Sequence, residues 1–229
     1  VYLKKDPITL IANSVYIHEL GTPSSNDILL FKETDPEFEL SISLSRTKKY
    51  AYINIESTNS NEIRIIDINK PTLEPITFIK RTENHLYYLE HLNNESFFVR
   101  SNLDAPNFQI LKSSSFDDNE ISNLELIVSH DESIFISDIL YTNNNLVMEI
   151  RENGLPELSI LHLKSNKSYS IDFGDMTETR YYPAAVSNST RGVVAGLPSK
   201  ESALRAYARD FKIVEELYVF LLERKEEAS

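Results

Sequence analysis

Short runs of alternating apolar residues dominate the chain from Ile28 to Phe173. The runs are rich in β-branched and aromatic residues and are bounded by Asn, Ser, Asp, Pro or Gly, which is typical of β-strands. In LGTPSSNDILLFKETDPEFELSISLS (residues 20–45), for example, Asp35-Pro36 separates two such runs. The pattern predicts strands at 28–33, 38–45, 50–57, 62–68, 76–80, 86–92, 96–101, 107–112, 124–128, 134–141, 146–151, 158–163 and 168–173.

The strand pattern recurs along the chain. The similar runs FELSISLS, HLYYLEHL and SIFISDIL start at residues 38, 85 and 133, which are 47 and 48 residues apart. Four short strands in about 40–50 residues are typical of a β-propeller blade, and a β-sandwich with accidental spacing is the alternative. We therefore expect an all-β partial β-propeller of about four four-stranded blades in residues 1–175.

The strand at 62–68 is apolar in both of its phases. Ile63 and Ile65 alternate with Ile66 and Ile68, so neither face of this strand is polar. Such a strand belongs to a sheet that is packed on both faces. The end blades of a partial propeller would expose faces and edges, so we expect either association or a covering by the rest of the chain.

Beyond the strands, residues 176–196 form a mixed stretch that we expect to be a linker. In 197–229 the apolar spacing becomes helical, with two seven-residue series: Leu197, Leu204, Phe211 and Tyr218, then Tyr207, Val214, Leu221 and Ala228. This predicts a C-terminal amphipathic α-helix whose seam must pack on something. A terminal docking helix and a coiled-coil arm both fit the spacing.

Composition limits the partners and the chemistry. The formal net charge of −12 and the pI near 4.9 argue against nucleic acid as a partner. The chain has no cysteine, which excludes disulfides, thiolate zinc sites and a cysteine nucleophile and fits a bacterial cytoplasmic protein. No apolar run approaches the ~20 residues of a membrane span.

No catalytic constellation emerges from the residue spacing. A nucleophile elbow needs Gly-x-Ser-x-Gly, but the glycines four apart, Gly192 and Gly196, enclose Val194. We expect surface or packing roles for the histidines, which are His18, His85, His91, His130 and His162. We expect solvated charge at the acidic pairs Asp117/Asp118 and Glu226/Glu227, and chance sequons at Asn94, Asn166 and Asn188. The prediction is therefore no catalytic, cofactor-binding or metal-binding residue.

Several motifs in order resemble the β-propeller domain of the prolyl oligopeptidase family, above all its oligopeptidase B branch. They are HELGTP (18–23), DPEF (35–38), SRTKKY (45–50), NEIRIID (61–67), SNLDAPNF (101–108) and ENGLPELSILHL (152–163), within residues 2–173. The resemblance implies a seven-bladed propeller that caps a serine-peptidase catalytic domain, admits peptides and excludes folded proteins. The triad would lie in that hydrolase domain, which these residues lack, so we expect no activity from this chain alone.

The segment 197–229 resembles a different family. LPSKE, RDFKIVEELY and LLERKEEA are similar to the coiled-coil segment of polysaccharide chain-length determinants and their bacterial tyrosine-kinase relatives. This resemblance implies an interaction or assembly module that self-associates through its helical arm. It would place the chain in the periplasm instead of the cytoplasm.

Overall fold

The computed structural model describes residues 1–92, 95–116, 120–172, 186–188 and 191–193. Its contacts divide the chain into two compact units. The first unit contains Val1–Ile139 and Ile150–Asn153, and the second contains Leu140–Glu149 and continues from Gly154. In the described residues no helix is long and apolar enough to cross a membrane.

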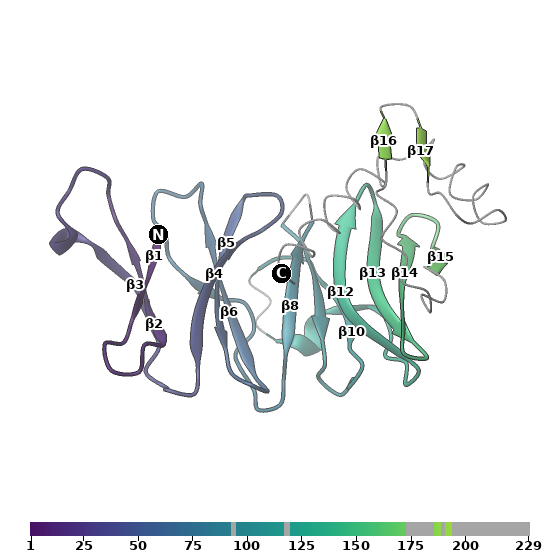
Figure 1. Cartoon of the computed structure of the whole chain (residues 1–229), viewed down its shortest axis with the longest axis horizontal. Helices are drawn as coiled ribbons and strands as arrows, with labels where there is room; N and C mark the ends of the chain where they lie inside the picture. The colour runs from purple at the N-terminus through teal and green to yellow at the C-terminus, as the bar shows by residue number, and fades with distance from the viewer. Residues whose placement is uncertain (93–94, 117–119, 173–185, 189–190, 194–229) are drawn as a thin grey trace. The chain divides into compact units, whose positions relative to one another are not determined.

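The regular structure of the described residues is almost entirely β (Figure 1), and its strands pair in antiparallel fashion. Sheet A contains three strands in sequence order: β1 (Tyr2–Lys5), β2 (Ala12–Ile17) and β3 (Ile28–Lys32). Sheet B contains four: β4 (Glu39–Leu44), β5 (Tyr50–Glu56), β6 (Asn61–Asp67) and β7 (Ile76–Thr77). Two single 3-10 turns, η1 (Ser24–Asn26) and η2 (Ile121–Asn123), complete the described helical structure.

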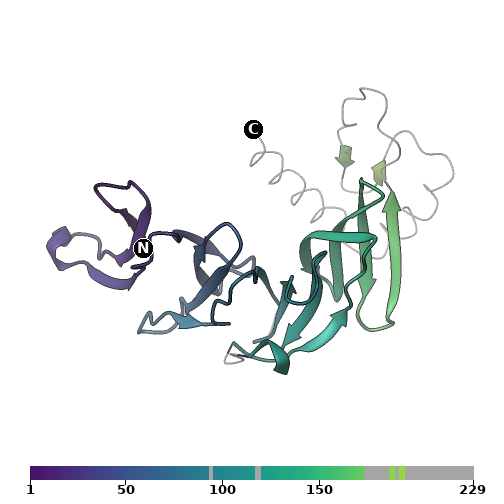
Figure 2. The same cartoon turned by 90° about the horizontal axis from the view of Figure 1, so that it is seen from below.

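Two further sheets repeat the four-stranded pattern of sheet B. Sheet C contains β8 (Tyr87–His91), β9 (Phe97–Ser101), β10 (Gln109–Ser113) and β11 (Glu125–Val128). Sheet D contains β12 (Ile134–Thr142), β13 (Asn145–Glu152), β14 (Leu155–His162) and β15 (Lys167–Asp172). A separate hairpin, sheet E, pairs β16 (Val186–Asn188) with β17 (Arg191–Val193). The same strands are seen from below in Figure 2.

The structure confirms the predicted partial propeller and differs from it in detail. Sheet A has three described strands instead of four, and β1 and β2 were not predicted, because alternation is weak in the first residues of the chain. Strand β7 ends at Thr77 because Phe78 and Ile79 turn into the core, where they are 0% and 4% exposed. The expected linker 176–196 contains the hairpin of sheet E. The helix predicted in 197–229 lies outside the described residues.

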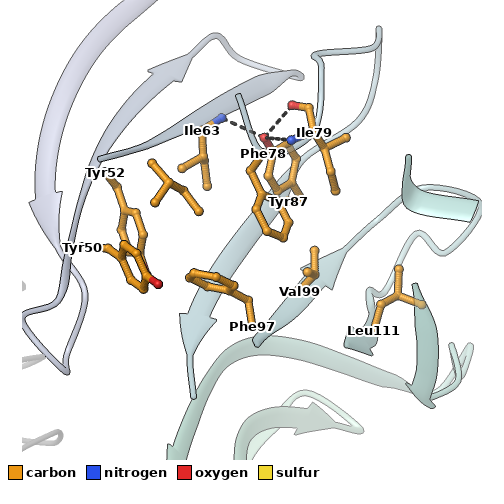
Figure 3. Packing of buried hydrophobic residues seen from close by; sticks show 10 residues of the cluster. Tyr50, Tyr52, Ile63, Phe78, Ile79, Tyr87, Phe97, Val99 and Leu111 are labelled. Carbon is orange, nitrogen blue, oxygen red and sulfur yellow. Dashed lines mark hydrogen bonds between the residues drawn. The ribbon is translucent and has the colours of Figure 1, made fainter. Parts of the chain in front are cut away.

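Sheet B is packed on both faces, as the two apolar phases of 62–68 predicted. One face packs against sheet A in a cluster of Ala12, Val15, Phe38, Leu40, Ala51, Ile53, Ile55 and Ile66. The other face packs against sheet C (Figure 3) in a cluster of Tyr50, Tyr52, Ile63, Ile65, Phe78, Ile79, Tyr87, Phe97, Val99 and Leu111. Ile68 lies just beyond β6 and is 42% exposed, so it takes no part in this core.

Within the second unit, sheet D has its own small core. Leu140, Val147, Leu158 and Ile160 are all less than 5% exposed and form one cluster. Strand β14 pairs with β15 in unbroken register, for example with Leu158 opposite Ile171. The turn before β13 has positive φ at both Asn143 and Asn144, a conformation that asparagine tolerates better than most residues.

The phenol of Tyr87 links sheet C to sheet B through hydrogen bonds. The Tyr87 hydroxyl accepts hydrogen bonds from the backbone N–H groups of Ile63 (2.8 Å) and Ile79 (3.3 Å) and donates to the Ile79 carbonyl (2.7 Å). Figure 3 shows these three bonds. One comes from β6 and two come from the segment that follows β7. Tyr87 is fully buried, and burial raises the pKa of its hydroxyl, so the group stays neutral.

We predict that Tyr87→Phe destabilises the chain by about 1–3 kcal/mol, because it leaves buried backbone groups without their partner. The measurement is the urea dependence of unfolding, compared with that of Tyr16→Phe. The Tyr16 hydroxyl forms no hydrogen bond within the described residues, so its removal should change the free energy of unfolding by less than about 0.5 kcal/mol. Equal effects of the two substitutions would contradict this role of Tyr87.

Candidate functional site

Two of the histidines, His85 just before the predicted strand 86–92 and His91 within it, are packing residues. His85 is 1% exposed and its Nε2 lies 3.0 Å from the Ser101 hydroxyl; burial lowers the pKa of His85. His91 is 3% exposed, and its Nδ1 hydrogen-bonds to the Thr47 hydroxyl. Both side chains are buried: the ring of His85 packs on Tyr87 of its own sheet, and the ring of His91 packs on Tyr50 of sheet B.

The other histidines are only partly buried. His162 bonds locally to Ser165 (2.8 Å), and His130 is half-buried. His18 belongs to a small polar group that the sequence pattern did not single out: its Nδ1 lies 2.7 Å from one oxygen of Asp27, and the Tyr2 hydroxyl donates to the other (2.7 Å). Hydrogen bonds from Tyr2 and His18 lower the pKa of Asp27.

The structure describes three more of the positions that the sequence analysis named. Asn166 lies in the β14–β15 turn, Asn188 ends β16 and Gly192 lies in β17. Outside the described residues lie Asn94, Asp117, Asp118, Val194, Gly196, Glu226 and Glu227. In the part of the chain that the structure describes, no group of three or more His, Asp or Glu side chains could hold a metal ion.

The main polar features join neighbouring sheets. At one end of the seam between sheets B and C, the Asn61 side chain donates to the Tyr87 carbonyl (2.6 Å) and accepts from the Tyr87 N–H (2.9 Å). At the other end, Thr47 contacts His91, and Arg46 lies 3.6 Å from Glu90. This seam is therefore fixed by directional bonds at both ends.

The seam between sheets A and B has its polar contacts at one end. Arg81, which follows β7, donates to Glu33, which follows β3, at 2.8 Å and 3.5 Å. Arg81 also covers the Phe38 ring at 4.1 Å, and its backbone N–H donates to Glu62 at 3.4 Å. We call Glu33, Glu62, Arg64 and Arg81 the ionic cluster; Arg64 bonds to Glu62 (3.0 Å) and stacks on Phe31 (4.1 Å).

Glu33 is the most buried carboxylate of the ionic cluster, at 6% exposure. Burial alone would raise its pKa, but hydrogen bonds from Arg81 and from the backbone N–H groups of Asp35 and Thr34 outweigh burial and lower the pKa. Glu33 therefore stays ionised at neutral pH. No sequence pattern indicates this pair, because its members are 48 residues apart and follow no period.

A small cavity lies beside sheet B. Its volume is about 110 Å³, and Tyr50, Asp67, Lys70, Glu74 and Phe116 are among its lining residues. A water molecule occupies about 30 Å³ in the liquid, so the cavity has room for a few waters and not for a peptide. The polar groups described above thus join neighbouring sheets, and this cavity is too small to hold a substrate peptide.

Stacked antiparallel sheets of four strands, each apolar toward its neighbours, define a β-propeller fold. The family model of the prolyl oligopeptidase N-terminal β-propeller domain matches residues 2–190. The chain belongs to this family, through its propeller domain. The family model does not extend to 197–229, so the coiled-coil arm stays a prediction.

Similar proteins agree with this assignment. Dipeptidyl aminopeptidase BI of Pseudoxanthomonas mexicana is 30% identical over 169 residues, which is 73% of this chain and 23% of that protein. Protease 2 of Moraxella lacunata is 30% identical over 146 residues, which is 63% of this chain and 20% of that protein. The chain spans less than a quarter of the length of these two relatives.

Solved structures show the same fold at lower identity. Oligopeptidase B from Leishmania major superposes with a TM-score of 0.69 at 20% identity, over 76% of this chain and 25% of that chain. Oligopeptidase B from Trypanosoma brucei, with covalently bound antipain, superposes with a TM-score of 0.68 at 20% identity, over 76% of this chain and 26% of that chain. Both likenesses concern the propeller sheets of the present chain.

We predict that Arg81→Met costs about 1–3 kcal/mol at neutral pH, because it leaves the buried Glu33 carboxylate unpaired. Adding Glu33→Gln should recover part of this loss, since it removes the unpaired charge. The stability that ionised Glu33 contributes is present above its unfolded pKa and is lost as the pH falls through its lower folded pKa. Without Arg81 that loss should begin at a higher pH.

Urea unfolding between pH 3 and 7 measures all of these effects. Lys80→Met is the matched control, because Lys80 adjoins Arg81 but is exposed and has no ion pair in the described structure. Equal effects of Lys80→Met and Arg81→Met, or no recovery on adding Glu33→Gln, would contradict a structural ionic cluster.

Proposed function

We propose that residues 2–172 are part of a cap that admits peptides to the catalytic domain of a serine oligopeptidase and excludes folded proteins. The observation that carries this proposal is the match of the propeller-domain model to residues 2–190, on sheets that pack as propeller blades do. We also propose a bacterial cytoplasmic location, which the lack of cysteine in the sequence fits.

The contacts within the cap support a non-catalytic role. A hydroxyl bonded to an imidazole is the first requirement of nucleophilic catalysis, and Thr47 with His91 is a pair of that kind. His91 is 3% exposed, however, and its ring packs against the Tyr50 ring with 4.8 Å between the centroids, so this pair belongs to the packing between sheets B and C. We therefore propose that these residues hold the cap together and that catalysis belongs to the partner domain.

A chimaera tests the cap directly. Residues 2–172 would replace the matching segment of the Pseudoxanthomonas mexicana enzyme, with which they share 30% identity. We expect the chimaera to cleave a chromogenic dipeptidyl substrate and to leave a folded protein, such as native ribonuclease, intact. A chimaera that digests the folded protein as fast as an unfolded one would contradict the proposal.

Two controls complete this test. The parental enzyme measures the exclusion that a complete native cap provides. The isolated 229-residue chain, incubated with a chromogenic peptide containing Arg or Lys, should give no turnover above background. Robust turnover by the isolated chain would show that it carries its own active centre.

A second candidate is an assembly module that self-associates through 197–229, with a periplasmic location. The observation in its favour is the pair of seven-residue apolar series in that segment. Light scattering of the full chain and of a chain ending at residue 196 decides it: self-association predicts a multimer that becomes a monomer on deletion. A full chain of monomeric mass, unchanged by the deletion, would count against this function.

A further inference from the structure

A buried imidazole takes part in the contact between sheets B and C. His85 lies two residues before β8, and its ring packs on the Tyr87 ring with 5.4 Å between the centroids. The carbonyl of His85 accepts a hydrogen bond from the Asn61 N–H of sheet B (3.2 Å). The Asn61 side chain in turn bonds to the backbone of Tyr87. His85 therefore belongs to the set of bonds that joins the two sheets at this end of their seam.

The hydrogen bonds around the His85 ring fit its neutral form. Its Nε2 lies 3.0 Å from the Ser101 hydroxyl, whose oxygen also accepts the Leu103 N–H (3.2 Å). The serine can therefore donate its own proton to Nε2, which then acts as an acceptor. Protonation would make Nε2 a second donor toward the Ser101 oxygen, and the serine proton would lose its partner. The charged ring thus fits this buried position worse than the neutral one.

No opposite charge offsets the protonation of His85. Among the described residues no carboxylate bonds to its ring, and the titratable group that packs on it is the neutral phenol of Tyr87. Of the carboxylates on the adjoining segments, Glu83 and Asp104 are exposed, and Glu62 already has an arginine partner. Burial lowers the pKa of His85 from its ordinary value of 6.5, because burial removes water from the charged form.

We propose that the seam between sheets B and C is an acid-sensitive joint, which opens at its Asn61 end when His85 takes up a proton. A group whose pKa is lower in the closed state binds its proton more readily in the open state, so acid favours opening as the pH falls below 6.5. The seam between sheets A and B responds in a lower range, because the pKa of Glu33 is lowered from 4.5. Opening of the joint exposes the aromatic cluster that Figure 3 shows.

The test is amide hydrogen exchange of the full 229-residue chain between pH 7.5 and 5, expressed as protection factors that correct for the intrinsic effect of pH. The amides of Asn61, Ile63 and Tyr87 report on the joint, because their hydrogen bonds cross it. Their protection should fall below pH 6.5, by up to about tenfold for each pH unit, which is the limit for one proton. The amides of Thr34 and Asp35, which bond to the buried carboxylate of the ionic cluster, should keep theirs. An equal fall in both sets, or no fall in the first, would overturn the proposal.

Substitutions assign the effect to one ring. His85→Gln keeps a side chain that can bond to Ser101 but does not titrate in this range, so the protection of the joint should no longer depend on acid. His162→Gln is the matched control, because His162 is only partly buried and bonds locally to Ser165; it should leave the acid dependence unchanged. Equal effects of the two substitutions would contradict the assignment to His85.

A titration of the His85 ring, followed by NMR in the unsubstituted chain, tests the joint without any variant. The ring should take up its proton over the same pH range in which the joint loses protection. Protection that falls while the His85 ring stays neutral would overturn the proposal, even where His85→Gln does not fold.

Discussion

Burial on both faces of sheet B is the constraint on which the rest of the first unit depends. Strand β5 sends Tyr50 and Tyr52 toward sheet C and Ile53 and Ile55 toward sheet A, so each phase of one strand serves a different core. A sheet with two apolar faces cannot face water on either of them. Sheet B is therefore stable only between neighbours, and this mutual dependence is what makes a stack of such sheets cooperative.

Apolar packing is non-directional, so it does not fix how one sheet lies on the next. The polar contacts supply that direction. The side chain of Asn61 bonds to the backbone of Tyr87 as a neighbouring strand would, and the Tyr87 hydroxyl returns to sheet B. Between sheets A and B the bidentate pair of Glu33 and Arg81 has this role at one end of the seam. The seam between sheets B and C, bonded at both ends, is the more constrained of the two.

The need to cover apolar sheet faces also applies to sheet A. Its second face carries Tyr2, Tyr16 and Leu29 in register, with the two rings stacked at 5.7 Å, and Tyr2 and Leu29 are 39% and 46% exposed. A face of this composition is the kind that a neighbouring sheet covers elsewhere in the chain.

The sequence by itself determined the strands and their pairing into repeats, because alternation has a period of two and turn residues mark its limits. The two apolar phases of Ile63, Ile65 and Ile66 also predicted the two-sided packing. Only the tertiary structure brought Glu33 to Arg81 and Asn61 to Tyr87, since a contact between distant residues leaves no period in the chain. It likewise buried His91, because Thr47 and Tyr50 of the first hairpin of sheet B lie against its ring.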